Sequence, residues 1–216
     1  MLYPLAPWIL RGNAFQTLQW AEISKVRSHI PAELEIVPFL PGKTLAGIYL
    51  ARYHAGSTLE YSELIVVAAY VRYAGQSGAW ISHIYVDQPA SVAGGRAIWS
   101  LPKELADFNW ETSDSPIRPD RQQVTVRQQQ QLLCRLEWSW QLPLWPQGLS
   151  VSSFCTLDPS FSIFDAKSRF KLHLLGASLE IRPESPFASL HLGRPWLAIA
   201  AQELNLVVEP PQGLKS

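Results

Sequence analysis

One lysine of this chain stands in an unusually apolar stretch of sequence. Lys103 follows Pro102 directly, with Trp99 and Leu101 just before it, and it is one of only six lysines among 216 residues. A lysine enclosed by apolar side chains loses hydration of its ammonium form, which lowers its pKa. The neutral amine can then attack a ketone or aldehyde and form a Schiff base. The alternative is a surface lysine whose stem lies along an apolar face.

A carboxylate forms the second candidate for chemistry. Glu63 opens the segment 63–73 (ELIVVAAYVRY), in which apolar residues occupy both faces of a predicted strand. Such strands are usually covered on both sides, and a carboxylate near the core needs a partner. We therefore predict Glu63 as an acid/base or orienting group, about 3–6 Å from the Lys103 amine in a closed, mostly apolar cavity. The alternative places Glu63 at the solvent end of the strand, beside Glu60.

Two charged residues between these candidates are predicted to give structural support. Asp87 follows a predicted strand, and Arg96 comes after Gly94 and Gly95. A glycine-flanked arginine in a chain of low charge needs nearby acceptors if it is buried. We expect Arg96 to hold the turn after Asp87, and we interpret His83 as a structural histidine. No spacing of histidines and cysteines is typical of a metal site, and we expect no metal or cofactor.

The elements that must position these residues are mostly strands. Seventeen prolines divide the chain into short elements. Residues 63–73 and 79–86 predict a hairpin around Gly75–Gly78. We expect short helices over 21–29 and 93–99, and a further one over 190–200. The pattern favours a mainly β (α+β) fold: a single domain over 1–216, with an antiparallel, closed β-barrel-like core and a few short helices. The other predicted strands are 44–53, 123–127, 132–140, 170–175, 177–181 and 204–208.

Composition narrows the partners. Eighteen basic and 18 acidic residues, with no basic stripe, argue against a nucleic-acid partner. No apolar run approaches the roughly 20 residues that span a bilayer, so we expect no membrane partner. Two cysteines and no signal-peptide pattern favour a cytoplasmic location. Only 17% of residues are charged and nine are tryptophans, and Trp/Pro-rich segments such as Trp138–Trp145 indicate a homo-oligomer.

Three short motifs give the chain a resemblance to a known family. Tyr85-Val-Asp87, Gly95-Arg96 and Pro102-Lys103 resemble the signature of acetoacetate decarboxylases over about 61–108. In that family a tyrosine–aliphatic–aspartate strand end precedes Gly-Arg-Glu and then Pro-Lys-Lys. The resemblance implies that Lys103 is the Schiff-base lysine and Glu63 the catalytic glutamate, in a large oligomer. A small-molecule carbonyl or keto-acid substrate follows from it, and Trp99 and Leu101 become candidate substrate contacts.

The chain departs from the family pattern at three places. Glu104 stands where the family has a second lysine, and its carboxylate would favour the ammonium form if it approached the amine. Ala97 replaces the glutamate of Gly-Arg-Glu. The family's substrate-carboxylate arginine aligns with Gly12, so its neighbour Arg11 becomes the candidate substrate-binding residue.

Several functions remain open from sequence. The first is a Schiff-base-forming lyase that acts on a β-keto acid or related carbonyl compound, in which the protonated imine accepts the electrons released as CO2 leaves. A related aldolase or dehydratase would use the same amine. A non-catalytic β-barrel that binds a small apolar or carbonyl ligand is the alternative from another class, as is a structural protein that has lost the chemistry. Borohydride trapping distinguishes them, because only an imine is fixed by reduction.

Overall fold

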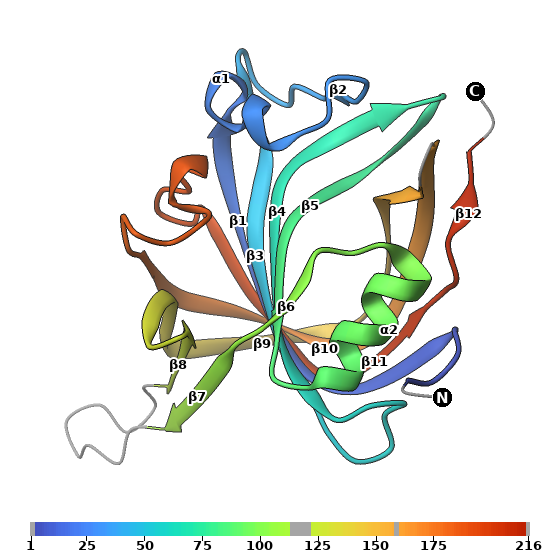
Figure 1. Cartoon of the computed structure of the whole chain (residues 1–216). Coiled ribbons are helices and arrows are strands. Elements are labelled where there is room, and N and C mark those ends of the chain that lie inside the picture. Colours follow the sequence, from blue (N-terminus) through green and yellow to red (C-terminus); the bar gives the residue numbers. More distant parts are fainter. Residues whose placement is uncertain (1–2, 113–121, 158–159, 215–216) are drawn as a thin grey trace.

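The computed structural model describes residues 3–112, 122–157 and 160–214, and strands dominate it (Figure 1). The mainly β fold with a few short helices is confirmed. The elements are β1 (Trp8–Glu22), α1 (Ile23–Val26), η1 (Arg27–His29), β2 (Glu35–Ile36), β3 (Lys43–Tyr53), β4 (Tyr61–Tyr73), β5 (Gln76–Val86), α2 (Pro89–Trp99), β6 (Lys103–Leu105), β7 (Asp107–Thr112), β8 (Gln122–Gln128), β9 (Gln131–Leu157), β10 (Ser160–Ile181), η2 (Ala188–Leu190), β11 (Leu197–Val208) and β12 (Gln212–Gly213).

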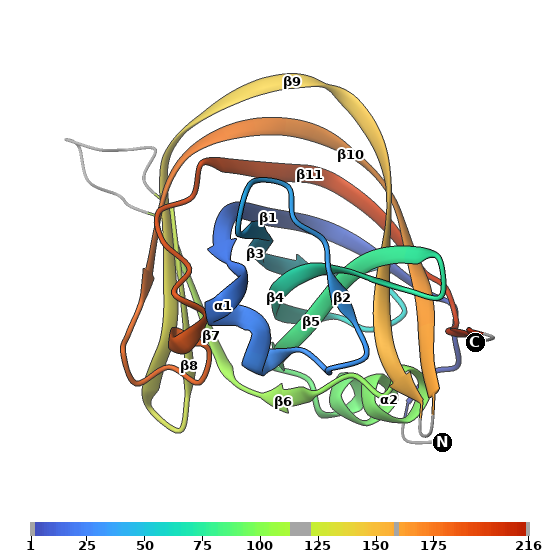
Figure 2. The same cartoon turned by 90° about the horizontal axis from the view of Figure 1, so that it is seen from above.

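The strands form one sheet that returns on itself as a ring. Neighbours follow the order β10-β11-β1-β3-β4-β5-β9, and β9 pairs again with β10. Most of these ladders are antiparallel, whereas β5 pairs in parallel with both β6 and β9. Figure 2 shows β9, β10 and β11 as long curved strands arching over β1, with α2 and β6 on the side away from that arch. The ring surrounds the space that Lys103 and Glu63 line.

Irregularities in the ladder let β9 bend far enough to close the ring. Between the pairs Lys171↔Pro146 and His173↔Pro143, β9 carries one residue more than β10, and a second shift follows toward Trp138. An extra residue on one strand bends it and raises its twist. Prolines are tolerated at such bulges because they cannot donate to a regular ladder. The Pro/Trp-rich part of the sequence therefore lies at the bend of β9.

β4 separates two parts of the core, as its doubly apolar sequence predicts. Leu64, Val66 and Ala68 pack with residues of α1, β8 and β9 on one side. Tyr61, Ile65 and the residues in register with them belong to a second cluster that includes Trp8, Trp99 and Leu101. Both faces of β4 are thus covered by apolar side chains. Because side chains alternate along a strand, Glu63 lies on the same face as Tyr61 and Ile65, which is the face of the second cluster.

Local sequence pattern predicted some of these elements correctly and failed for others. The hairpin of β4 and β5 is confirmed, with its turn at Ala74 and Gly75. The helix expected over 93–99 is part of α2, and the one over 21–29 becomes the short α1 and η1. The helix expected over 190–200 is wrong, because Pro195 precedes a strand, β11. None of the helices among the described residues is long and apolar enough to cross a membrane.

Candidate active site

Helix α2 presents three of its residues toward Lys103. Gln88 caps its start by accepting from the backbone N–H of Ala90, and Ser100 ends it in the left-handed conformation. Ser91, Gly95 and Trp99 lie four residues apart, so they share one helical face. A Cβ on Gly95 would lie 2.5 Å from Cδ of Lys103, so the absent side chain leaves the room that the lysine stem occupies.

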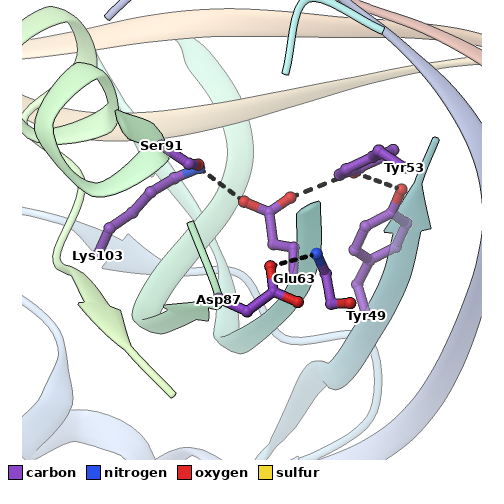
Figure 3. Close-up of polar contacts among 7 residues, drawn as sticks. Tyr49, Tyr53, Glu63, Asp87, Ser91 and Lys103 are labelled. Atoms are coloured by element: carbon purple, nitrogen blue, oxygen red, sulfur yellow. Dashed lines mark hydrogen bonds and ion pairs between the residues drawn. The ribbon is translucent and has the colours of Figure 1, made fainter. Parts of the chain in front are cut away.

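The amine of Lys103 is buried against the carboxylate of Glu63 (Figure 3). Nζ lies 2.7 Å from Oε1 of Glu63 and donates a second hydrogen bond of 3.0 Å to Oγ of Ser91. The two charged side chains are only 5% and 6% exposed. The rings of Trp8 and Tyr61 lie 5.5 and 5.1 Å from the amine. The expected burial and proximity of the pair are confirmed, and the alternative positions at the solvent surface are wrong.

A row of tyrosines continues from the other oxygen of Glu63. The Tyr53 hydroxyl donates to Oε2 over 3.2 Å, and the Tyr49 hydroxyl lies 3.1 Å from that of Tyr53 (Figure 3). Burial raises the pKa of all three nearby tyrosines, Tyr49, Tyr53 and Tyr61, well above the ordinary value, and the charge of Glu63 adds to this effect. These phenols therefore stay neutral and act as hydrogen-bonding groups rather than as bases near neutral pH.

The side chains of Asp87 and Arg96 form hydrogen bonds with backbone groups and do not line the cavity. Oδ1 of Asp87 accepts from the N–H of Ser62 over 2.7 Å, which ties the end of β5 to the residue before Glu63. Nε of Arg96 donates to the carbonyl oxygen of Lys103 over 2.8 Å. The expected backbone contact of Arg96 is therefore present, but it anchors the start of β6 and not the turn after Asp87. The side chain of Arg96 is exposed, not buried.

The Lys103–Glu63 pair opens into a cavity of about 210 Å³ inside the ring. Among the residues that line it, Lys103 and Glu63 alone carry charge, and Gln16 contributes an amide. Apolar side chains make up most of the rest, including the predicted substrate contacts Trp99 and Leu101. An enclosed amine beside a carboxylate in such surroundings can form an imine and exchange protons locally. The described residues hold no group of histidine, cysteine and acidic side chains that could bind a metal ion.

Two residues singled out in the sequence do not face this cavity. Arg11 alternates with the buried Leu10 along β1, so its side chain is exposed and is absent from the cavity lining. Glu104 follows Lys103 in β6 and points to the other side, where Oε2 accepts from Gln128 over 2.7 Å. The Glu104 carboxylate therefore does not approach the Lys103 amine, so the condition under which it would favour the ammonium form is not met.

Sequence reasoning missed several groups around the amine. Ser91, Tyr49 and Tyr53 were not singled out, although each is in the hydrogen-bonded network of Glu63 and Lys103. The helix predicted over 93–99 begins after Ser91, whereas α2 begins at Pro89 and so places Ser91 on the same face as Gly95. His83 lies on another side of β5, 2.9 Å from Oγ of Ser82, and does not line the cavity.

Comparison with known proteins places these features in a wider group. The family model "Acetoacetate decarboxylase (ADC)" matches residues 5–167. Protein NEOXANTHIN-DEFICIENT 1 of Oryza sativa subsp. japonica is 32% identical over 109 residues, which are 50% of this chain and 36% of the rice protein. Acetoacetate decarboxylase 3 of Mesorhizobium japonicum is 46% identical over 37 residues, 17% of this chain and 14% of its own length.

Solved structures agree on the fold. Acetoacetate decarboxylase from Legionella pneumophila superposes with a TM-score of 0.75 at 16% identity, covering 100% of this chain and 90% of its own. The enduracididine biosynthesis enzyme MppR, complexed with the condensation product of pyruvate and imidazole 4-carboxaldehyde, gives a TM-score of 0.68 at 12% identity, covering 99% of this chain and 91% of its own. At these identities the likeness concerns the fold alone. The chain spans well under half of the rice relative that it matches.

Proposed function

The chain belongs to the acetoacetate decarboxylase family, and on that premise we propose that it is a lyase or related enzyme that forms a Schiff base between Lys103 and a carbonyl compound. The observation that carries the proposal is the Nζ–Oε1 distance of 2.7 Å within an apolar cavity. A buried ion pair can become a neutral pair by moving one proton from the ammonium to the carboxylate. That transfer gives the free amine that attack requires.

The geometry assigns a part to each group. The nitrogen of Lys103 attacks the carbonyl carbon, and the π electrons move to the carbonyl oxygen. Glu63, which took the first proton from the ammonium, gives it to that oxygen and so forms a carbinolamine. Glu63 then accepts a second proton from the nitrogen and passes it to the hydroxyl group, which leaves as water while the C=N bond forms. Tyr53 holds the second oxygen of Glu63, and Ser91 orients the amine. The protonated imine then withdraws electrons from the neighbouring carbon, whether the bond broken there is to CO2, to hydrogen or to another carbon.

A binding function is the second candidate, and the apolar cavity lining favours it. A protein that only holds a small apolar or carbonyl ligand needs the enclosed volume but not the amine. The condensation product in MppR shows that a relative in fold accommodates a carbonyl-derived molecule, and an aldolase or dehydratase would use the same imine. Covalent capture distinguishes these candidates, because a binding protein forms no imine.

The test is reductive trapping at neutral pH. The protein is incubated with a small ketone and borohydride, and we expect added ligand mass on the peptide that contains Lys103. Lys103→Ala alone would leave the Glu63 carboxylate buried without its cation, which costs about 3–5 kcal/mol of folding free energy. The control is therefore the double variant Lys103→Met with Glu63→Gln, which removes both charges. Absence of labelling in the wild type with several ketones and keto acids would favour the binding function.

We propose three further properties at the level of the whole chain. The ring uses strands from β1 to β11, which supports one domain over 1–216. Cys134 and Cys155 are both buried free thiols, which fits a reducing, cytoplasmic location. Large exposed apolar side chains on β9 support a homo-oligomer. The partner proposed for the site itself is a small carbonyl or keto-acid molecule, with no cofactor.

A further inference from the structure

Among the described residues, the cavity lining has no cation left over for a charged substrate. Lys103 and Glu63 are the only charged residues of that described lining, and they compensate each other at 2.7 Å. Arg11, the arginine expected to bind a substrate carboxylate, has an exposed side chain outside the cavity. A bound carboxylate would add one uncompensated negative charge beside Glu63. Burying an unpaired carboxylate is strongly unfavourable.

The neutral polar groups of the cavity do not replace the missing cation. The hydroxyls of Tyr49 and Tyr53 form the hydrogen-bonded row that ends on Glu63. Gln16 donates its side-chain N–H to the carbonyl oxygen of Thr17 over 2.7 Å. These contacts occupy both phenol protons and one of the two amide N–H groups of Gln16. Two serines also line the cavity, and the hydroxyl of Ser168 donates to the carbonyl oxygen of Leu149 over 3.0 Å. The lining therefore supplies a polar end at the amine, a few neutral polar groups and an otherwise apolar surface.

The volume of the cavity and the residues at its opening also favour a small apolar ligand. An apolar cavity of about 150 Å³ holds one benzene molecule, so about 210 Å³ corresponds to ~8 non-hydrogen atoms. Leu149 and Val151 of β9 line the cavity and are nevertheless 51% and 39% exposed. They form an apolar edge where the cavity reaches the surface. A ligand entering there passes aliphatic side chains before its carbonyl group reaches Lys103.

We propose that the substrate is a neutral, apolar aldehyde or ketone rather than a keto acid. This inference rests on the proposed imine chemistry and specifies its substrate class. With no carboxylate to lose, the protonated imine instead releases a proton from its α-carbon. The C–H electrons form the enamine, the iminium nitrogen becomes neutral, and Glu63 takes the proton. The reaction class is then carbon–hydrogen or carbon–carbon bond chemistry next to a carbonyl, not decarboxylation.

A matched pair of methyl ketones tests the proposal. Heptan-2-one and 5-oxohexanoate both carry three methylene groups after the ketone. The chain then ends in an ethyl group in heptan-2-one and in a carboxylate of similar size in 5-oxohexanoate. Borohydride trapping at Lys103 is followed by mass spectrometry, with each rate referred to that of butylamine under the same conditions. We expect heptan-2-one to label at least about 100-fold faster, because the carboxylate loses hydration without gaining a partner.

A charge introduced at Gln16 tests the cause of that preference. Gln16 is half-buried and lines the cavity, so a long polar side chain is already accommodated there. Gln16→Arg should reduce the ratio of the two labelling rates by about 10-fold or more, because a guanidinium pairs with the carboxylate of 5-oxohexanoate. Gln16→Met, which is of similar length and neutral, should leave that ratio unchanged.

The outcomes are separable. Labelling by 5-oxohexanoate as fast as by heptan-2-one in the wild type would overturn the neutral-substrate inference and leave the Schiff base in place. A gap that Gln16→Arg does not narrow would also overturn it, because charge would not be the cause. If neither compound labels the wild type, and the double variant Lys103→Met with Glu63→Gln is equally unlabelled, the imine chemistry itself is rejected.

Discussion

Glu63 is buried with a different donor on each of its oxygens. Lys103 contacts Oε1 and Tyr53 contacts Oε2, so the carboxylate is satisfied on both sides. A buried carboxylate that loses one such partner pays the desolvation cost without compensation. In the proposed mechanism, the same two contacts fix the oxygen that receives the proton of the amine. Stability and the proposed chemistry at this residue therefore depend on the same hydrogen bonds.

The tyrosine row gives a graded prediction. Tyr53→Phe removes the donor to Oε2 of Glu63, and we expect trapping at Lys103 to slow by about 10-fold. Tyr49→Phe removes a group one step farther away, so its effect should be smaller. The pH profile of trapping provides a second measurement, because only a change at Glu63 or Lys103 would move it. Equal effects of the two variants, with unshifted profiles, would indicate general loss of packing.

Alkaline pH should destabilise the fold through the same residues. Burial raises the pKa of Tyr49, Tyr53 and Tyr61 above the ordinary 10.0, so the unfolded chain releases these protons first. The free energy of unfolding then falls as pH rises above 10, by up to about 1.4 kcal/mol per pH unit for each group. Denaturant unfolding between pH 8 and 11.5 measures the slope. Tyr49→Phe should reduce it, and an unchanged slope would argue against the burial.

Local sequence identified the buried Lys103–Glu63 pair but not the groups around it. Lys103 and Glu63 stood out because each is a charge among apolar neighbours and because the spacing of the motif resembled a family signature. Tyr49 and Tyr53 lie in a strand that reads as ordinary β sequence. Their approach to Glu63 follows from the register of β3 against β4, in which Ala51 pairs with Glu63. Register is a property of the folded sheet, so these contacts required the structure.

At the scale of elements, helix α2 is what aligns the lysine. Ser91 contacts the amine, Gly95 leaves space for the stem, and Arg96 holds the carbonyl of Lys103. Ser91 and Gly95 restrict the rotamers of the lysine side chain, and Arg96 fixes the backbone from which that side chain extends. Such preorganisation is what places an amine within reach of both a carbonyl carbon and its proton acceptor.

Gly95→Ala tests this alignment. The new Cβ would lie 2.5 Å from Cδ and 2.7 Å from Cε of Lys103, so the lysine stem must move. We expect trapping to slow by about 100-fold, as misplacement by about 1 Å can cost, although alanine is the better helix former. Gly193→Ala is the matched control, because a Cβ there meets nothing within 4 Å. An unaffected trapping rate in Gly95→Ala would contradict the alignment.

Element prediction failed where tertiary pairing outweighs local pattern. β1 was not expected, because its polar and apolar residues mix, with Gln16 and Gln19 directed inward. Its strand conformation is supported by ladders with β3 and β11 on either side. The segment 190–200 has helical composition, yet from Leu197 onward it pairs with β1 and β10. A strand between two partners gains hydrogen bonds that a local helical preference cannot match.

At the scale of the whole molecule, one part of the ring remains exposed. The bend of β9 carries Leu142, Trp145, Leu149 and Val151, which are 52%, 67%, 51% and 39% exposed. Several large apolar side chains exposed along one strand favour an interaction surface there. Because Leu149 and Val151 also line the cavity, a second subunit on this surface would alter access to the site.

The last prediction concerns that surface. We expect light scattering at micromolar concentration to give a mass that is a multiple of 24.3 kDa, because association would remove the apolar bend of β9 from water. Trp145→Ser should lower the mass toward that of one chain. Leu5→Ser is the control, since Leu5 is equally exposed at 66% but lies in the N-terminal segment before β1. A wild type that runs as a monomer of 24.3 kDa would contradict the prediction. A mass lowered only by Leu5→Ser would place the contact elsewhere on the molecule.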